Sequence, residues 1–218
     1  MNMHDAPGLI ASSSALLEAI LRNIPYTGSI IGAMFFIHLC NILLGRKLMY
    51  LGIIPRRPIG LIGIICAPWL HATFTHLLFN SLPLFVLMNA IYLISGPYSD
   101  LTFVLVSLQI IFWSGLFTWI FGRYALHIGS SGAVLGYMGY IIASWYFHQT
   151  VFMALLLIIL LYYIGAILMG LFPQDEGVSW EGHVCGFFGG ILTAGHSYHY
   201  ISYPAWLDAV FSHASFYI

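Results

Sequence analysis

Residues His127–Gly136, HIGSSGAVLG, run directly into the apolar stretch YMGYIIASWYF, and they decide how the whole chain is interpreted. Two serines flanked by glycines stand at the start of a helix that is otherwise apolar enough for a membrane. Polar groups inside hydrocarbon are costly and usually functional. Glycines let the backbone turn sharply and leave space beside a hydroxyl, while a helix start presents unpaired N–H groups. The stretch therefore predicts a functional serine at the head of a membrane helix.

The composition places the chain in a membrane. Hydrophobic residues make up 61% of the 218 residues and charged residues only 6%, which is too little charge to cover a soluble domain. The net charge of −1 gives no reason to expect nucleic-acid binding. The cysteines show no CxxC spacing and are predicted to be buried small side chains, so no metal and no cofactor is expected; they are Cys40, Cys66 and Cys185. No cleavable signal peptide is expected.

The hydrophobic pattern predicts an all-α polytopic membrane protein with three regions. Residues 1–27 form an N-terminal amphipathic surface segment, in which helical spacing over 8–23 ends at Pro25. Residues 28–201 form a bundle of six transmembrane helices, and residues 202–218 form an interfacial tail. Within the bundle the loop 46–75 is apolar and aromatic, so it is expected to lie partly in the membrane. The spans are expected near 28–45, 76–95, 101–121, 131–147, 150–171 and 181–201.

Polar side chains gather at the heads of the second, fourth and sixth spans. His76 and Asn80 lie in the second span, Ser131 begins the fourth, and His183 lies near the start of the sixth. Alternate spans run in the same direction, so these heads share one depth and one side of the membrane. A serine becomes a nucleophile when a neighbouring base takes its proton, and histidine suits that task. His76 and Asn80, four residues apart, can both donate to an oxyanion.

Glycines predict which helices touch. Gly132 and Gly136 are four apart, and so are Gly182, Gly186 and Gly190. Small residues at this spacing let membrane helices approach closely, which would bring Ser131 within hydrogen-bond reach of His183. Glu181 does not share a helix face with His183, so a Ser–His dyad without an acid is the economical interpretation. His71 and His38 are first interpreted as structural hydrogen-bonding residues.

These motifs resemble the rhomboid family of intramembrane serine proteases. The matching stretches are HATFTHLLFN at 71–80, GSSG at 129–132 and GHVCGFFGG at 182–190, and the resemblance covers about residues 28 to 201. It implies that Ser131 is the nucleophile, that His183 is the general base, and that His76, Asn80 and the Ser131 N–H form the oxyanion hole. The glycines expected to pack helices are Gly129, Gly132, Gly136, Gly186 and Gly190.

The resemblance also implies a mode of action. The loop 46–75 would be half submerged, and residues 173–180, PQDEGVSW, would cap the active site. The implied partners are transmembrane segments of other proteins, which enter near the second and fifth spans, and the lipid bilayer; the oligomeric state stays open. Two departures concern loop anchoring and histidine orientation. Residues 46–66 contain Arg56 and Arg57 but no tryptophan, and Leu135 stands where some members have a tyrosine.

The charges conflict with the implied orientation. Five of the six Lys and Arg residues lie on the predicted active-site side, with Arg22 on the other; the five are Arg46, Lys47, Arg56, Arg57 and Arg123. The positive-inside rule would place that side in the cytoplasm. Bacterial members of the family place it outside, and we follow the resemblance. The expected location is the bacterial cytoplasmic membrane.

Four other functions compete with this interpretation. A rhomboid-like pseudoprotease that binds helices without cutting them is the main alternative, although both Ser131 and His183 are present. A redox or metal protein would need ligand-spaced Cys and His sets, which the sequence does not show. A transporter would show inverted repeats or buried charges, and the spans have neither. An aspartyl protease is excluded because every aspartate lies outside the spans, namely Asp5, Asp100, Asp175 and Asp208.

Overall fold

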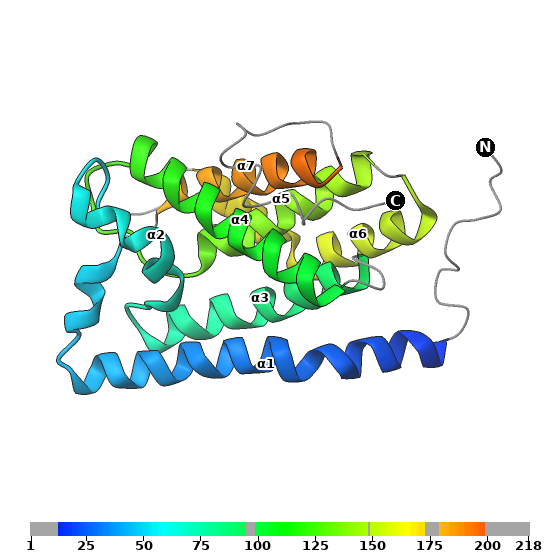
Figure 1. Ribbon diagram of the computed structural model, residues 1–218, viewed down its shortest axis with the longest axis horizontal. Helices are drawn as coiled ribbons and strands as arrows, with labels where there is room; N and C mark the ends of the chain where they lie inside the picture. Colours follow the sequence, from blue (N-terminus) through cyan, green and yellow to red (C-terminus); the bar gives the residue numbers. More distant parts are fainter. Residues whose placement is uncertain (1–12, 95–98, 148, 173–178, 199–218) are drawn as a thin grey trace.

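The computed structural model describes residues 13–94, 99–147, 149–172 and 179–198, which Figure 1 shows as helices lying roughly side by side. The all-α class is confirmed for this part of the chain. Its one β feature is an isolated bridge between Ile53 and His127. The terminal segments 1–12 and 202–218 and most of the predicted cap, residues 173–178, lie outside the described residues.

Each predicted span coincides with a helix. The long helices are α1 (Ser13–Leu43), α3 (Phe74–Ile94), α4 (Ser99–Phe121), α5 (Ser131–Phe147), α6 (Val151–Ile164), which continues into the 3-10 helix η5 (Gly165–Leu171), and α7 (Trp180–Ser197). Among the described residues, three stretches are long and apolar enough to cross a membrane: Ile20–Leu43, Phe74–Ile94 and Asp100–Phe121.

The predicted count of six spans is not confirmed by length and composition. A fourth span is reached if α6 and η5, which are bent by 73°, are counted as one. Helix α5 has 17 residues and α7 has 18, both fewer than the roughly 20 that cross a 30 Å hydrocarbon core without help. Both carry several glycines and polar residues near their starts, which lowers their apolar signal.

The prediction that Pro25 ends the first helix is wrong. Helix α1 continues from Ser13 to Leu43 with Pro25 inside it. Proline removes one backbone N–H, but helices in membranes tolerate it because nearby hydroxyls and neighbouring helices bond the backbone. In the turns next to Pro25, Thr27 Oγ1 donates to Asn23 O at 3.2 Å and Ser29 Oγ donates to Tyr26 O at 2.7 Å. Neither acceptor is the Leu21 carbonyl, which is the one that loses its helical donor at the proline.

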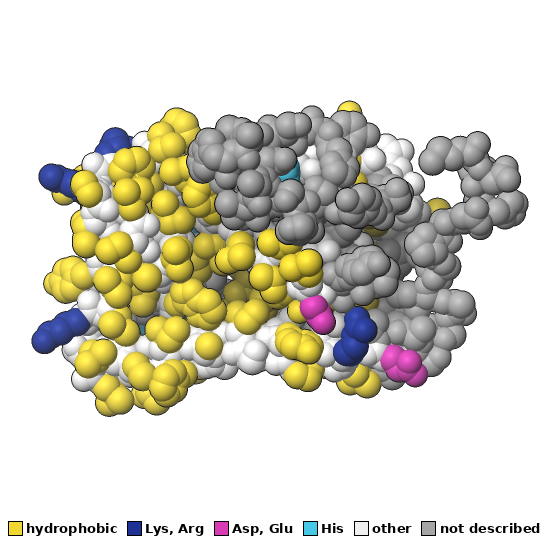
Figure 2. All heavy atoms as spheres, viewed as in Figure 1, with side chains coloured by type: hydrophobic (Ala, Val, Ile, Leu, Met, Phe, Trp, Pro, Cys, Tyr) yellow, Lys and Arg dark blue, Asp and Glu magenta, His cyan; other side chains and the backbone are white. Residues whose placement is uncertain are grey.

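The described surface is that of an integral membrane protein. Large apolar side chains are exposed on α1, α3 and α6, for example Leu43 at 77%, Phe79 at 76% and Val151 at 79%. Figure 2 shows hydrophobic side chains over most of the described part of one face. Apolar cover on this scale is unfavourable in water and favourable against lipid.

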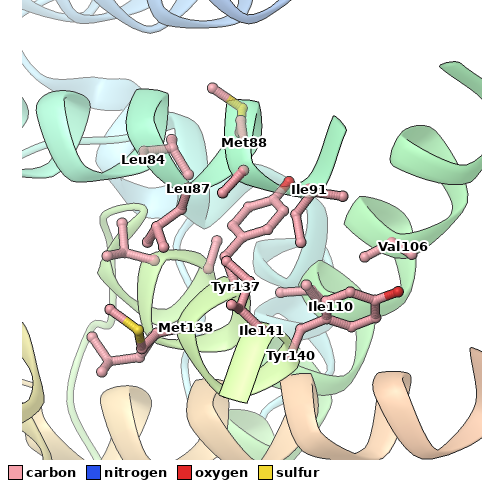
Figure 3. Close-up of a cluster of buried hydrophobic side chains, with 14 of the residues drawn as sticks. Leu84, Leu87, Met88, Ile91, Val106, Ile110, Tyr137, Met138, Tyr140 and Ile141 are labelled. Carbon is pink, nitrogen blue, oxygen red and sulfur yellow. The ribbon is translucent and has the colours of Figure 1, made fainter. Parts of the chain in front are cut away.

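Helix α5 forms the centre of the bundle. Its side chains meet those of α3 and α4 in a buried hydrophobic cluster, drawn in Figure 3, in which Tyr137, Met138, Tyr140 and Ile141 come from α5. Polar pairs add specificity between helices. Tyr137 donates to Ser107 Oγ at 2.6 Å, and Asn89 Nδ2 donates to Thr27 Oγ1 at 3.1 Å, which joins α3 to α1.

The loop 46–75 is folded against the end of α4. It contains η1 (Lys47–Leu51), η2 (Pro58–Leu61), α2 (Gly63–Cys66) and η3 (Ala67–Trp69). Arg56 Nη1 donates to Ile120 O and to Gly122 O, each at 2.9 Å, and Trp119 Nε1 donates to Arg57 O at 2.9 Å. The depth of this loop in a membrane stays a prediction.

Candidate active site

Helices α5 and α7 pack through the predicted glycines. A Cβ at Gly186 would collide with the carbonyl oxygen of Gly132, and a Cβ at Gly190 with that of Gly136. Only residues without side chains allow two helix backbones to approach so closely. The close packing predicted from the four-residue spacing is therefore present.

This packing sets the starts of the two helices against each other. Ser131 is the first residue of α5, and a Cβ on the next residue, Gly132, would lie 3.3 Å from Gly182 O, directly before His183. Ser131 is half-buried and lines a cavity of about 40 Å³ together with Thr118, Ser179 and Gly182. Because a water needs about 10–15 Å³ measured in this way, the cavity has space for water beside the serine.

His183 is held by a backbone carbonyl. Its Nδ1 lies 2.8 Å from Gly170 O in η5. A carbonyl oxygen can only accept, so Nδ1 carries the hydrogen and Nε2 keeps its lone pair in the neutral ring. The hydrogen bonds among the described residues do not include one between Ser131 Oγ and His183. Such bonds are often long in enzymes without substrate and tighten in the complex.

The two predicted oxyanion donors face the turn before Ser131. A Cβ at Gly129 would lie 2.8 Å from His76 Nε2 and 3.7 Å from Asn80 Nδ2, so both nitrogens point at this turn. Asn80 Nδ2 also donates to His76 O at 3.0 Å.

Gly129 has a different place from the one predicted. It precedes α5 with φ at 107°, a left-handed conformation that favours glycine, so it forms the turn and does not pack the helices.

His71 supports the same turn, which the sequence did not reveal. Its Nε2 accepts from Ser130 N at 3.3 Å and lies 3.3 Å from Ser130 Oγ, and its ring centroid is 5.1 Å from that of His76. The side chain is buried, and burial, followed by the neighbouring His76, lowers the pKa of His71 to about 4. His71 is thus a hydrogen-bonding residue, as interpreted, but what it holds could not be read from its spacing.

His127 orders the start of α7, again without a signal in the sequence. Its Nε2 bonds Arg123 O at 2.9 Å and its Nδ1 bonds Ser179 Oγ. Ser179 caps α7 by accepting from Gly182 N at 3.3 Å. His127 therefore connects the segment before α5 to the helix that carries His183.

Glu181 is paired with Arg123. Its Oε1 lies 3.6 Å from Arg123 Nε. Among the described residues Glu181 forms no hydrogen bond with His183, whose Nδ1 instead bonds Gly170 O. Within the described part of the chain, no group of three or more His, Cys, Asp or Glu side chains could hold a metal ion.

Comparisons with known proteins agree with the fold. The family model described as "Rhomboid domain" matches residues 58–199. Uncharacterized proteins of Mycobacterium bovis and Mycobacterium tuberculosis are each 32% identical over 173 residues, which cover 75% of this chain and 70% of the relative. An uncharacterized protein of Mycobacterium leprae is 32% identical over 141 residues, which cover 61% of this chain and 54% of the relative.

Proposed function

The chain belongs to the rhomboid family, and from this premise we propose that it is an intramembrane serine endopeptidase. It would hydrolyse peptide bonds in or near transmembrane segments of other membrane proteins through a Ser131–His183 dyad. The observation that carries the proposal is the close approach of the starts of α5 and α7, where a Cβ at Gly132 would lie 3.3 Å from Gly182 O. This contact sets a serine and a histidine on adjacent helix ends beside a turn that faces two further donors.

The reaction follows from these positions. Ser131 Oγ attacks the scissile carbonyl while His183 Nε2 takes the hydroxyl proton, and the same proton then passes to the leaving amine. The negative oxygen formed in this step accepts from the Ser131 N–H, His76 and Asn80. Water from the neighbouring cavity, again deprotonated by His183, hydrolyses the acyl-enzyme and releases the second product.

The bundle around this site completes the proposal. We take all six helices to span the membrane, with α5 and α7 short because their heads end below one membrane face. In this arrangement the membrane domain extends from the Ile20–Leu43 stretch of α1, rather than from residue 28, to residue 201. The chain before this stretch and residues 202–218 lie at the surface, and the loop 46–75 is half submerged. The proposed location is the bacterial cytoplasmic membrane.

Cleavage of a model transmembrane substrate in liposomes tests the proposal. The native chain should cut the substrate, and Ser131→Ala and His183→Ala should each abolish cleavage. Ser29→Ala is the matched control, because this exposed serine in α1 bonds only Tyr26 O. A folded native chain that neither cuts a broad substrate panel nor reacts with a fluorophosphonate would replace the proposal with the helix-binding pseudoprotease.

A further inference from the structure

The ring of His183 is fixed at one nitrogen by a partner outside its own helix. Gly170 O accepts from Nδ1 at 2.8 Å. This carbonyl lies near the end of η5, where backbone oxygens lack partners within the helix. The neighbouring bond among the described residues runs from Phe172 N to Met169 O at 3.2 Å and does not use Gly170 O.

Only glycine permits this approach. A Cβ at residue 170 would lie 2.8 Å from His183 Nδ1 and 3.3 Å from Cε1. Real Cβ atoms essentially never approach another atom to 2.8 Å, so a side chain at residue 170 would require the ring or η5 to shift. The glycine is explained by the histidine next to it.

Among the described residues, neither Glu181 nor Leu135 bonds the imidazole of His183. Glu181 is paired with Arg123, and Leu135, one turn after Ser131, is buried in the core and has no polar atom to offer. We propose that the Gly170 carbonyl is the positioning group of His183, in the role that an acid plays in a Ser–His–acid triad. This inference rests on the proposed function, because it concerns the base of that reaction.

The assignment ties the base to a second element. Residue 170 belongs to η5, which continues α6 after a bend of 73°. Because the carbonyl is part of the backbone, a displacement of η5 withdraws it from Nδ1 and frees the ring to rotate or to change tautomer. The placement of α6 and η5 thus sets the orientation of His183 on α7.

Gly170→Ala tests the role of the carbonyl, with Gly165→Ala as the matched control. At Gly165 a Cβ would meet only Leu161 side-chain atoms at 3.8 and 3.9 Å, which is ordinary contact. Gly170→Ala should lower kcat about 100-fold with KM unchanged, since a misplacement near 1 Å costs about that much. Fluorophosphonate labelling of Ser131 should slow in parallel, whereas Gly165→Ala should keep native values. A folded Gly170→Ala protein with native kcat and labelling would overturn the proposal.

Nitrogen NMR of ring-labelled histidine supplies a readout that depends neither on activity nor on the folding of Gly170→Ala. In the native protein the His183 signal, identified by its loss in His183→Ala, should show hydrogen on Nδ1 and none on Nε2. A native ring with hydrogen on Nε2 refutes the proposal. If the native chain neither cuts nor labels, the protease function fails, and the tautomer still decides whether Gly170 holds the ring.

Discussion

Single glycines decide the closest contacts of this molecule. In helix–helix contacts within a membrane, apolar surface gains little by leaving lipid, so van der Waals packing must hold the helices together. The contacts of Gly186 with Gly132 and of Gly190 with Gly136 are backbone to backbone. A backbone cannot move aside as a flexible side chain can, so one added methyl group must separate the helices.

Gly190→Ala should therefore lower the melting temperature of the purified protein. Its Cβ would collide with Gly136 O and lie 2.8 Å from Tyr140 N, and overpacking of this kind typically costs about 1–3 kcal/mol. Gly32→Ala is the control, since a Cβ there meets nothing within 4 Å. A thermal scan in detergent in which both variants melt together would contradict the packing argument.

His71 makes stability depend on pH. Its pKa falls from 6.5 to about 4 on folding. Between these two pH values His71 is therefore protonated in the unfolded chain and neutral in the folded chain. The contribution of neutral His71 to the free energy of unfolding should be fully present above about pH 6.5. It should decline as the pH falls toward 4, by up to about 3 kcal/mol.

The check is to compare melting temperatures at pH 7 and pH 4.5 for the native chain and His71→Gln. Glutamine does not titrate in this range, so the variant's melting temperature should drop less between the two pH values. Equal drops would show that His71 is not the group responsible.

At the scale of elements, hydrophobic runs and glycine spacing predict helices and a contact between two of them. They do not predict the contacts that loops make. The residue ranges of α3, α4, α5 and α7 follow from apolar runs bounded by turns, and the α5–α7 contact follows from glycines four apart. The prediction that the first helix ends at Pro25 fails because a proline interrupts a helix in water more strongly than a helix in a membrane.

Three features of the site could not be predicted in this way: the carbonyl of Gly170, the turn held by His71 and the α7 cap next to His127. Each joins segments far apart in the chain through a backbone atom or a single side chain, such as His71 to Ser130 or His127 to Ser179. A contact of this kind leaves no periodic pattern. The sequence analysis expects Gly129 to pack helices, because a glycine pattern alone does not distinguish a turn from a helix contact.

Two neighbouring arginines, Arg56 and Arg57, contribute side chains to the attachment of the loop 46–75 near the end of α4. Arg56 adopts φ of 58° and donates to two carbonyls at the end of α4, whereas Arg57 lies over the Tyr124 ring at 5.6 Å. Arg56→Ala should cost about 1–2 kcal/mol of stability, since it removes two bonds from a charged donor. Arg57→Ala should cost about 0.5–1 kcal/mol, as an exposed cation–π contact does. Melting temperatures in detergent that rank the two variants the other way would refute this attachment.

At the scale of the whole molecule, most of the positive charges are gathered at one end. On the face drawn in Figure 2, Lys and Arg side chains lie mainly at the end formed by the loop 46–75, with further positive charge nearer the opposite end. The positive-inside rule would place this end in the cytoplasm. Three of the five cations there are engaged by the protein itself: Arg56 by carbonyls, Arg57 by Tyr124 and Arg123 by Glu181. These three charges therefore have structural roles that do not depend on which side of the membrane they face.

We therefore expect this end, and the proposed active site with it, to face away from the cytoplasm. The test places one cysteine at Tyr50, which is 74% exposed in the loop, or at Glu18, exposed before the Ile20–Leu43 span, after Cys40, Cys66 and Cys185 are replaced by alanine. In intact bacterial cells a membrane-impermeant maleimide should label Tyr50→Cys, and it should label Glu18→Cys only after permeabilisation. The reverse pattern would mean that the charges at this end do act as topology signals, and substrates would then be cut near the cytoplasmic face.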